Sequence, residues 1–165
     1  MEQIKGTIRS IRYTDPKNGY TVCDLKTGNN THVTLVGIMP MLAEGENIVA
    51  NGEYVSHPDY GRQFKVEQCE RNIPTLEEEI IQYLSSGIIK GLGKSTAKNI
   101  VEKFKDKTFE IFQFEPIRLA EVKGITPEKA FLFGQAFLEH ENMRNIIMFM
   151  QKYGVSSEIA AKIWN

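Results

Sequence analysis

The sequence lacks the features that mark membrane, secreted and metal-binding proteins. It has only two cysteines, Cys23 and Cys69, and neither has a cysteine or histidine partner at the spacing of a zinc site. We therefore expect buried, reduced thiols, no metal site and a cytoplasmic location. The longest fully apolar run, residues 146–150, is far shorter than the roughly 20 residues that cross a membrane. The first residues have no signal-peptide pattern, so we expect no contact with a membrane.

The chain also lacks an excess of charge of either sign. Its 165 residues include 20 lysines and arginines and 21 acidic residues, a formal net charge of −1. Any binding of DNA therefore has to depend on a local cluster of cations. Residues 87–107 contain such a cluster, because only Glu102 and Asp106 oppose six lysines: Lys90, Lys94, Lys98, Lys103, Lys105 and Lys107. The alternative interpretation is an ordinary solvated helix face.

A nucleotide-binding loop is absent as well. Gly93, Lys94 and Ser95 look like the end of a Walker A motif, but that motif needs a glycine where this chain has Ile88. Gly87 comes one residue too early, and the segment before it predicts a helix rather than a strand. We therefore expect that the chain is not itself an enzyme and holds no cofactor. An ATPase that is active as it stands is the disfavoured alternative.

The two halves of the chain have different periodicities. Up to about residue 72, short runs of β-forming residues lie between glycine and proline turns, which predicts about five or six strands. A barrel of the oligonucleotide-binding (OB) type suits this length and strand number. From Pro74 on, apolar residues recur at helical spacing, and Thr75 with Glu78 indicates a capping box. The sequence thus predicts two domains, an all-β OB-like barrel at 1–73 and an all-α domain at 74–165.

The helical half contains a degenerate repeat centred on Gly91, Gly124 and Gly154. Each glycine precedes an aliphatic residue, and an alanine follows six positions after the glycine. This pattern resembles the helix-hairpin-helix motif, whose hairpin amides and following helix N-terminus bind a phosphate without reading base sequence. We expect a tandem helix-hairpin-helix domain with a truncated third hairpin. Only the first copy keeps a second glycine, which Thr126 and Ser156 replace in the other two.

The first hairpin is the strongest candidate for a contact with DNA, and the second is a weaker one. In the second copy, Thr126 suits the N-cap position and Pro127 the first helical position, so a purely structural role stays open there. The predicted contacts in these two hairpins are Lys90, Gly91, Leu92, Gly93, Lys94, Ser95, Lys98, Lys123, Gly124 and Thr126.

Aromatic residues supply a second kind of candidate, because rings on a barrel can stack on the bases of a single strand. Tyr60, in a predicted turn beside Arg62, is the best exposed of them, and we predict that both residues contact DNA. The alternative is that most of these rings fill the core, which we favour for Phe64; the remaining candidates are Tyr13, Tyr20 and Tyr54. Core positions are also expected for Phe104, Phe109, Phe112, Phe114, Phe131, Phe133 and Phe137.

Two longer strings are specific in combination. The first is His57-Pro58-Asp59-Tyr60-Gly61-Arg62-Gln63-Phe64, and the second is Tyr83-Leu84-Ser85-Ser86-Gly87. With these strings the chain resembles, over nearly its whole length, the N-terminal part of bacterial RecD-like ATP-dependent DNA helicases. Such proteins are often labelled as the alpha subunit of exodeoxyribonuclease V. The resemblance implies an OB-like domain, tandem helix-hairpin-helix units and then a motor that moves 5′ to 3′ on single-stranded DNA.

That motor, with its ATP and magnesium, is not found in this sequence, so we interpret the chain as a fragment of a longer helicase. The expected function is a non-catalytic accessory region for DNA repair and recombination that contacts the DNA backbone without sequence specificity. The expected partners are single-stranded or forked DNA and the motor domain or other repair proteins. The alternative hypothesis is a protein-interaction module that docks the motor or another repair subunit.

Overall fold

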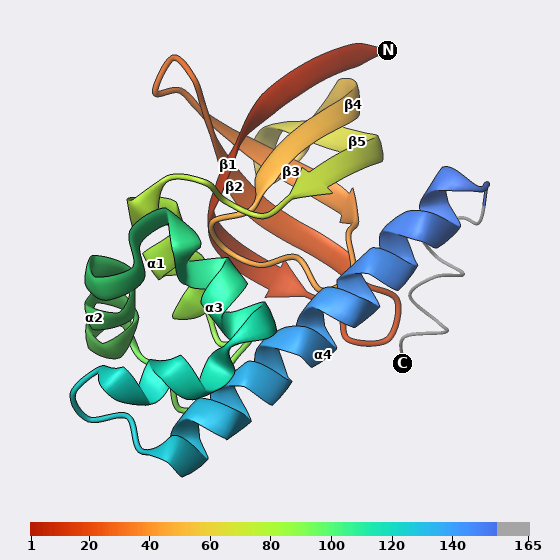
Figure 1. The fold of residues 1–165 in the computed structure, drawn as a ribbon. Helices are drawn as coiled ribbons and strands as arrows, with labels where there is room; N and C mark the ends of the chain where they lie inside the picture. The colour runs from red at the N-terminus through yellow and green to blue at the C-terminus, as the bar shows by residue number, and fades with distance from the viewer. Residues whose placement is uncertain (155–165) are drawn as a thin grey trace. The chain divides into compact units, whose positions relative to one another are not determined.

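The computed structural model describes residues 1–154, which form two compact units (Figure 1). Unit 1 consists of Met1–Ile73 and the described residues from Arg144 on, and unit 2 consists of Pro74–Met143. The last helix, α4 (Pro127–Lys152), contributes to both units, because it passes from one to the other between Met143 and Arg144. Among residues 1–154, no helix is both long enough and apolar enough for a membrane span.

Unit 1 contains the small β-barrel that the strand pattern predicts. Its strands are β1 (Glu2–Thr14), β2 (Tyr20–Thr27), β3 (His32–Ile38), β4 (Asn47–His57) and β5 (Gly61–Asn72). They close in the order β1-β2-β3-β5-β4 (Figure 1). The β3–β5 pair is parallel and every other pair is antiparallel. Alternate side chains point inward and form a core that consists of Ile8, Cys23, Leu25, Leu35, Met39, Ile48, Ala50 and Phe64.

Strand β4 is continuous through Gly52, although a glycine inside a strand often marks a turn or an irregularity. The β4–β5 register shifts between Asn51 and Gly52, so a bulge accommodates the glycine within one strand. A side chain at this position would collide with the backbone of Lys65 on β5. Gly52 therefore marks a close approach of two strands rather than a turn.

Three charged side chains are buried in unit 1, where two arginines bind the same glutamate. Nε of Arg71 donates to Oε1 of Glu46 at 3.0 Å, and Nε of Arg144 donates to the same oxygen at 3.3 Å. Arg71 also donates to the carbonyl oxygen of Pro40 at 2.6 Å, and Arg144 donates to that of Arg71 at 2.8 Å. Burial alone would raise the pKa of Glu46, but the two guanidinium groups hold it below its usual value. This triad of Glu46, Arg71 and Arg144 connects the C-terminal part of α4 to the barrel.

Unit 2 consists of short helices packed around aromatic rings. Its elements are α1 (Glu77–Leu84), α2 (Lys94–Phe104), the 3₁₀ helix η1 (Lys105–Lys107), α3 (Thr108–Phe114), the 3₁₀ helix η2 (Pro116–Glu121) and the first part of α4. Phe137 stacks on Phe109 with 5.5 Å between ring centroids, and Tyr83 meets the edge of Phe109 at 5.7 Å. The buried Tyr83 also donates a hydrogen bond to Glu141 at 2.9 Å.

The prediction of a tandem helix-hairpin-helix domain is wrong. Of the three glycine segments, only the first has an α-helix on both sides within residues 1–154, namely α1 and α2. The second follows the 3₁₀ helix η2, which begins at Pro116 and is only six residues long. A segment of that length lacks the extended apolar stripe that packs one α-helix against another. The third glycine, Gly154, ends the described part of the chain, so Ser156 lies outside it.

Two further expectations for this half are corrected. Helix α1 has Leu76 at its N-cap and no side-chain cap, so the predicted capping box of Thr75 and Glu78 is not formed. Phe114 and Phe131 are 72% and 59% exposed, whereas the sequence pattern places them in the core. The other phenylalanines predicted for the core are buried or half-buried: Phe104, Phe109, Phe112, Phe133 and Phe137.

Candidate nucleic-acid interface

The first glycine segment forms a tight turn between α1 and α2. The amide of Leu92 donates to the carbonyl oxygen of Ile89 at 3.3 Å, and Gly91, the third residue of the turn, has a φ of +84°. A positive φ at this position is typical of a type II turn and favours glycine. Ile89 and Leu92 are buried, while Lys90 and Gly91 are exposed. The apolar residues thus anchor the turn and leave its tip at the surface.

The turn leads directly into α2, whose N-terminus has no side-chain cap. Gly93 is the N-cap residue. The amide of Ala97 donates the first helical hydrogen bond to the carbonyl oxygen of Gly93 at 2.9 Å. A helix leaves its first amides without partners inside the helix, and the helix dipole makes this end positive. The first turn of α2 contains no acidic residue, and the space around Gly93 is open. An anion can therefore approach these amides closely.

Three lysines surround this uncapped helix end. Lys90, Lys94 and Lys98 are exposed, and none of them takes part in a salt bridge found within residues 1–154. Lys94 and Lys98 are one helical turn apart and share a face of α2. By contrast, Lys103 lies 3.6 Å from Glu121 and Lys107 lies 3.9 Å from Glu110. The turn and the first part of α2 thus carry three exposed lysines that form no salt bridge with a described carboxylate.

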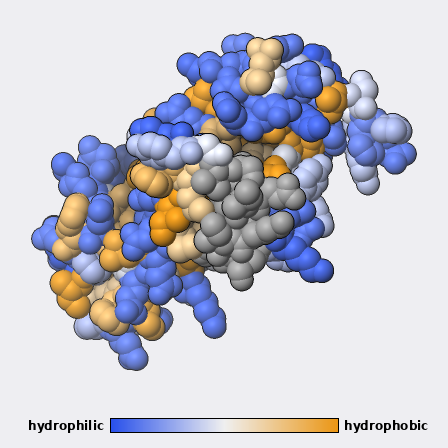
Figure 2. All heavy atoms as spheres, turned by 90° about the vertical axis from the view of Figure 1, so that its right-hand side faces the viewer, coloured by the Kyte–Doolittle hydropathy of each residue, from blue (hydrophilic) through white to orange (hydrophobic). Residues whose placement is uncertain are grey.

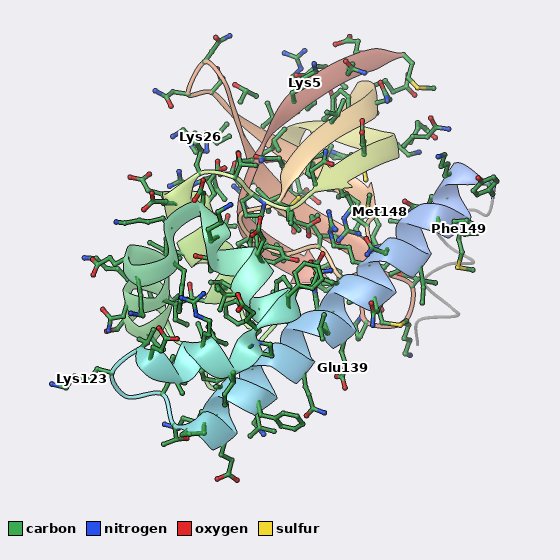
Figure 3. The ribbon with its side chains drawn as sticks, in the orientation of Figure 1. Lys5, Lys26, Lys123, Glu139, Met148 and Phe149 are labelled. Carbon is green, nitrogen blue, oxygen red and sulfur yellow. The ribbon has the colours of Figure 1, made fainter. Side chains whose placement is uncertain are left out.

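The second glycine segment repeats the turn but ends in a different cap. The amide of Ile125 donates to the carbonyl oxygen of Val122 at 3.1 Å, and Gly124 has a φ of +92°. Lys123 points away from the helices (Figure 3). Thr126 Oγ1, however, accepts a hydrogen bond from the amide of Lys129 at 3.1 Å, as its sequence position predicts. One of the amides that could bind an anion is therefore already satisfied.

The predicted contacts on the barrel lie at the β4–β5 hairpin. Tyr60 is 76% exposed, and Nδ1 of His57 holds the turn by accepting from the amides of Asp59 at 3.0 Å and Tyr60 at 3.2 Å. The guanidinium of Arg62 lies over the ring of Tyr54, 3.8 Å from its centroid. Phe64 is fully buried, as its interpretation as a core residue requires. The structure thus places the predicted residues at three sites, which are the two glycine turns and this hairpin.

Two of the remaining candidate rings of the barrel, Tyr13 and Tyr20, are 54% and 36% exposed. Alternation along β1 does not reveal the outward position of Tyr13, because a bulge precedes it. Burial raises the pKa of the Cys23 thiol to about 12 and also raises the pKa of Cys69, so both thiols favour the protonated form. Within residues 1–154, no group of three or more His, Cys, Asp and Glu side chains is placed to hold a metal ion.

Comparison with known proteins links the barrel to helicases. Residues 1–74 match the family model described as the OB-fold domain of the ATP-dependent DNA helicase YrrC. The ATP-dependent RecD2 DNA helicase of Deinococcus radiodurans is 23% identical to this chain over 160 residues. That match covers 93% of this chain but only 22% of the relative, so the chain spans about a fifth of the relative's length. Both findings support a likeness to the N-terminal OB region of RecD-like helicases.

Proposed function

We propose that this chain is a non-catalytic accessory region of a RecD-like 5′–3′ DNA helicase and binds the DNA backbone without sequence specificity. The likeness of residues 1–74 to a helicase OB-fold domain and the match to a RecD2 helicase support the parent activity. ATP and magnesium belong, in this proposal, to a motor domain outside this chain. The role of the chain is to hold DNA close to that motor.

The observation that carries the proposal is the uncapped start of α2 beside three exposed lysines. A backbone phosphate can accept hydrogen bonds from the amides of Lys94 and Ser95, because Gly93 supplies no side chain to occupy them. Lys90 and Lys98 add charge on either side of this position. Amides and lysines that meet phosphates fix the position of DNA without reading its bases. Binding of this kind is weak and sensitive to salt.

The other two predicted sites have smaller roles in this proposal. At the second turn, Lys123 and Gly124 are exposed, but Thr126 occupies one amide of the helix start, which leaves fewer donors for a phosphate. On the barrel, the exposed ring of Tyr60 can stack on an unpaired base. Arg62 is stacked on Tyr54 and still has N–H groups at its edge that can reach a phosphate. We therefore assign the largest contribution to DNA affinity to the first turn.

A matched pair of charge reversals tests this assignment. Lys90 and Lys123 occupy equivalent positions in the two turns, so Lys90→Glu and Lys123→Glu make the same chemical change at both. Fluorescence anisotropy with a forked DNA should give the wild type a dissociation constant on the order of 10⁻⁴–10⁻⁶ M. We expect Lys90→Glu to weaken binding about tenfold and Lys123→Glu to weaken it less than about threefold, because one lost contact with a charged group is worth about 1.5 kcal/mol.

A stronger variant and a salt titration complete the test. Gly91→Val with Lys94→Glu changes both the turn and its charge, and it should abolish most of the affinity. The slope of log affinity against log salt concentration should become shallower by about one for each phosphate contact that is lost. Thermal melting of each variant checks that the fold persists. Equal DNA binding by the wild type and all three variants would contradict the assignment of DNA binding to the first turn.

A second candidate function, docking of the motor domain or another repair subunit, rests on exposed apolar side chains. On the face drawn in Figure 2, apolar residues interrupt the hydrophilic surface. Pro116 packs against Gly134 of α4, which brings the exposed Phe114 and Ile117 beside the part of α4 that carries Phe131. A pull-down with the purified motor domain separates the two functions. Docking would be favoured if the motor domain captures the wild-type chain, the double variant Phe114→Ser with Phe131→Ser is not captured, and the chain has no affinity for DNA.

A further inference from the structure

Helix α4 has a second row of apolar residues, on the side away from its buried residues. Its buried residues include Phe133, Phe137 and Ile147. On the other side, apolar side chains and two amides recur three or four residues apart. We call this row the α4 stripe and define it as Phe131, Gln135, Leu138, Asn142, Ile146, Phe149 and Tyr153. Leu138 is half-buried, and the other members of the stripe are exposed.

The geometry of the stripe follows from the helix itself. α4 is continuous over 26 residues, so residues three or four apart share a face whichever unit contains them. Tyr153 directly follows the helix, and its amide still donates to the carbonyl oxygen of Phe149 at 3.2 Å. The rings of these two residues lie 4.6 Å apart, measured between their centroids. The stripe thus runs along most of a helix that is roughly 39 Å long.

The exposed apolar surface of the stripe calls for a partner. Its four large apolar side chains are between 45% and 67% exposed, namely Phe131, Ile146, Phe149 and Tyr153. Contiguous exposed apolar surface marks a site of interaction. Apolar residues at intervals of three and four form the seam along which two helices pack side by side. The stripe therefore predicts another helix as its partner.

The spacing of the stripe is symmetric about Asn142. Counted from this residue, the other members lie at equal distances on both sides: Leu138 and Ile146 at four residues, Gln135 and Phe149 at seven, and Phe131 and Tyr153 at eleven. In an antiparallel pair of α4 helices that meet at Asn142, each member lies level with a member of the other stripe. Aromatic rings then meet at both ends, aliphatic side chains meet beside the centre, and two amides meet at the centre. Self-complementarity of this kind is what a two-fold interface between identical chains requires.

The charges near the stripe favour an antiparallel pair over a parallel one. Nζ of Lys152 lies 5.9 Å from the centroid of the Tyr153 ring, at one end of the stripe, and Glu128 lies in the first turn of α4, at the other end. An antiparallel pair brings Lys152 of one copy toward Glu128 of the other, whereas a parallel pair gathers like charges at each end. Glu139, an exposed acid beside the middle of the stripe, lies level with the uncharged Asn145 of the other copy.

We propose that the chain forms a dimer in which two copies pack their α4 stripes together, antiparallel and centred on Asn142. The amide of Asn142 has both donors and an acceptor, so the two copies of it can pair across the two-fold axis. A polar residue at one position of such a seam fixes its register and orientation. The inference concerns self-association, goes beyond the proposed function and does not depend on it, because every measurement is made without DNA.

Sedimentation velocity of the complete chain over a range of concentrations tests the dimer. The wild type should change from monomer to dimer as its concentration rises. Ile146→Ser with Phe149→Ser removes two exposed apolar side chains from each copy and should weaken the dimer at least about a hundredfold. Leu76→Ser is the control, because Leu76 is 65% exposed but lies outside α4. It should leave the dimer unchanged, and thermal melting checks that each variant is folded.

Cross-linking tests the centre of the stripe. Asn142→Cys places two thiols beside the proposed two-fold axis, so a short bismaleimide should link two copies of this variant. Asn99→Cys is the matched control, because Asn99 is an exposed asparagine on α2. The wild type measures the background from the buried Cys23 and the half-buried Cys69. Equal yields of linked dimer from the two variants would contradict the proposed centre.

A charge pair tests the antiparallel orientation. Phe131→Lys alone should weaken the dimer. Adding Tyr153→Glu should restore it, because these two positions of different copies meet only in an antiparallel pair. A double variant that dimerises more weakly than Phe131→Lys would refute this orientation.

Two outcomes would overturn the inference as a whole. One is a wild-type chain that stays monomeric at every concentration. The other is a monomeric chain that captures a purified helicase motor domain through the stripe, so that Ile146→Ser with Phe149→Ser abolishes the capture. That result would assign the stripe to a contact with the motor instead of a second copy.

Discussion

The two units stabilise their cores by different means. Unit 1 buries the charged side chains of Glu46, Arg71 and Arg144. All residues of unit 2 are described, and none of its charged side chains is buried. Aromatic rings fill the centre of unit 2 instead. Ionisation should therefore control the stability of unit 1 far more than that of unit 2. The cations of unit 2 stay at the surface, where they can meet a ligand.

The buried triad of unit 1 is stabilising only while it is complete. Each of the three side chains makes hydrogen bonds to the others or to backbone carbonyl oxygens, and none of the described buried side-chain atoms lacks a partner. Removing one member of such a group leaves an uncompensated charge in a medium of low dielectric constant. The triad joins three separated positions of the chain, so its loss should affect the barrel and the end of α4 together.

The largest expected effect on stability is therefore that of Glu46→Gln. This variant keeps the shape of the side chain but leaves two buried guanidinium groups without a counter-charge, which should cost about 3 kcal/mol of the free energy of unfolding. Urea denaturation at neutral pH, followed by circular dichroism, measures this loss. Glu53→Gln on the exposed side of β4 is the control and should change stability by less than about 0.5 kcal/mol.

The same variant should also reduce the pH dependence of stability. The pKa of Glu46 in the folded state lies below its ordinary value of 4.5. The carboxylate therefore stabilises the fold fully above that value, and this contribution is lost as pH falls through the lower, folded-state pKa. Between neutral pH and pH values below 4.5, the wild type should lose more stability than Glu46→Gln. Equal losses in the two proteins would contradict the role assigned to the triad.

The sequence predicts the barrel well because its information is local. Alternating apolar residues and glycine or proline turns delimit the strands, and inward positions such as Leu25 and Leu35 follow from the alternation. The triad is a different case, because Arg144 follows Glu46 by 98 residues. No periodicity or motif links residues so far apart, so the return of α4 to the barrel becomes visible only in the structure.

In the helical half, short-range chemistry was predictable at the start of α4 but not at the start of α1, where the capping box of Thr75 is absent, and the packing was not predictable. The N-cap of Thr126 follows from a hydroxyl placed just before Pro127. The exposure of Phe131 does not follow from helical spacing, because spacing tells which residues share a face but not which face meets the core. At the candidate site, the lysines were visible in the sequence. That Lys90, Lys94 and Lys98 form no salt bridge could be recognised only from the structure, because it depends on where the acidic side chains lie.

An intermediate effect on unit 2 should come from Gly91→Ala. A residue with a Cβ atom at a φ of +84° costs about 1–2 kcal/mol, and the nearest neighbour of that Cβ, a ring carbon of Phe133 at 3.9 Å, adds no clash. Gly124→Ala, with a φ of +92°, should cost the same. Gly28→Ala, in open space without a positive φ, is the control. Because unit 2 buries no charge comparable to the triad, urea denaturation should give the same loss at neutral and at acidic pH. A loss that changes with pH would break the contrast between the units.

The smallest effects should come from exchanging the helix caps of the two turns. Thr126→Ala removes the hydroxyl that accepts from the amide of Lys129 and should cost about 1 kcal/mol. Gly93→Ser gives α2 the cap that it lacks and should add a few tenths of a kcal/mol. The added hydroxyl should also compete with a phosphate for the amides of α2, so Gly93→Ser should bind forked DNA more weakly even though it is more stable. Opposite signs for stability and affinity in one variant cannot result from a damaged fold. If Gly93→Ser keeps wild-type affinity in the anisotropy titration, the amides of α2 do not hold the phosphate, and the lysines alone account for binding at this turn.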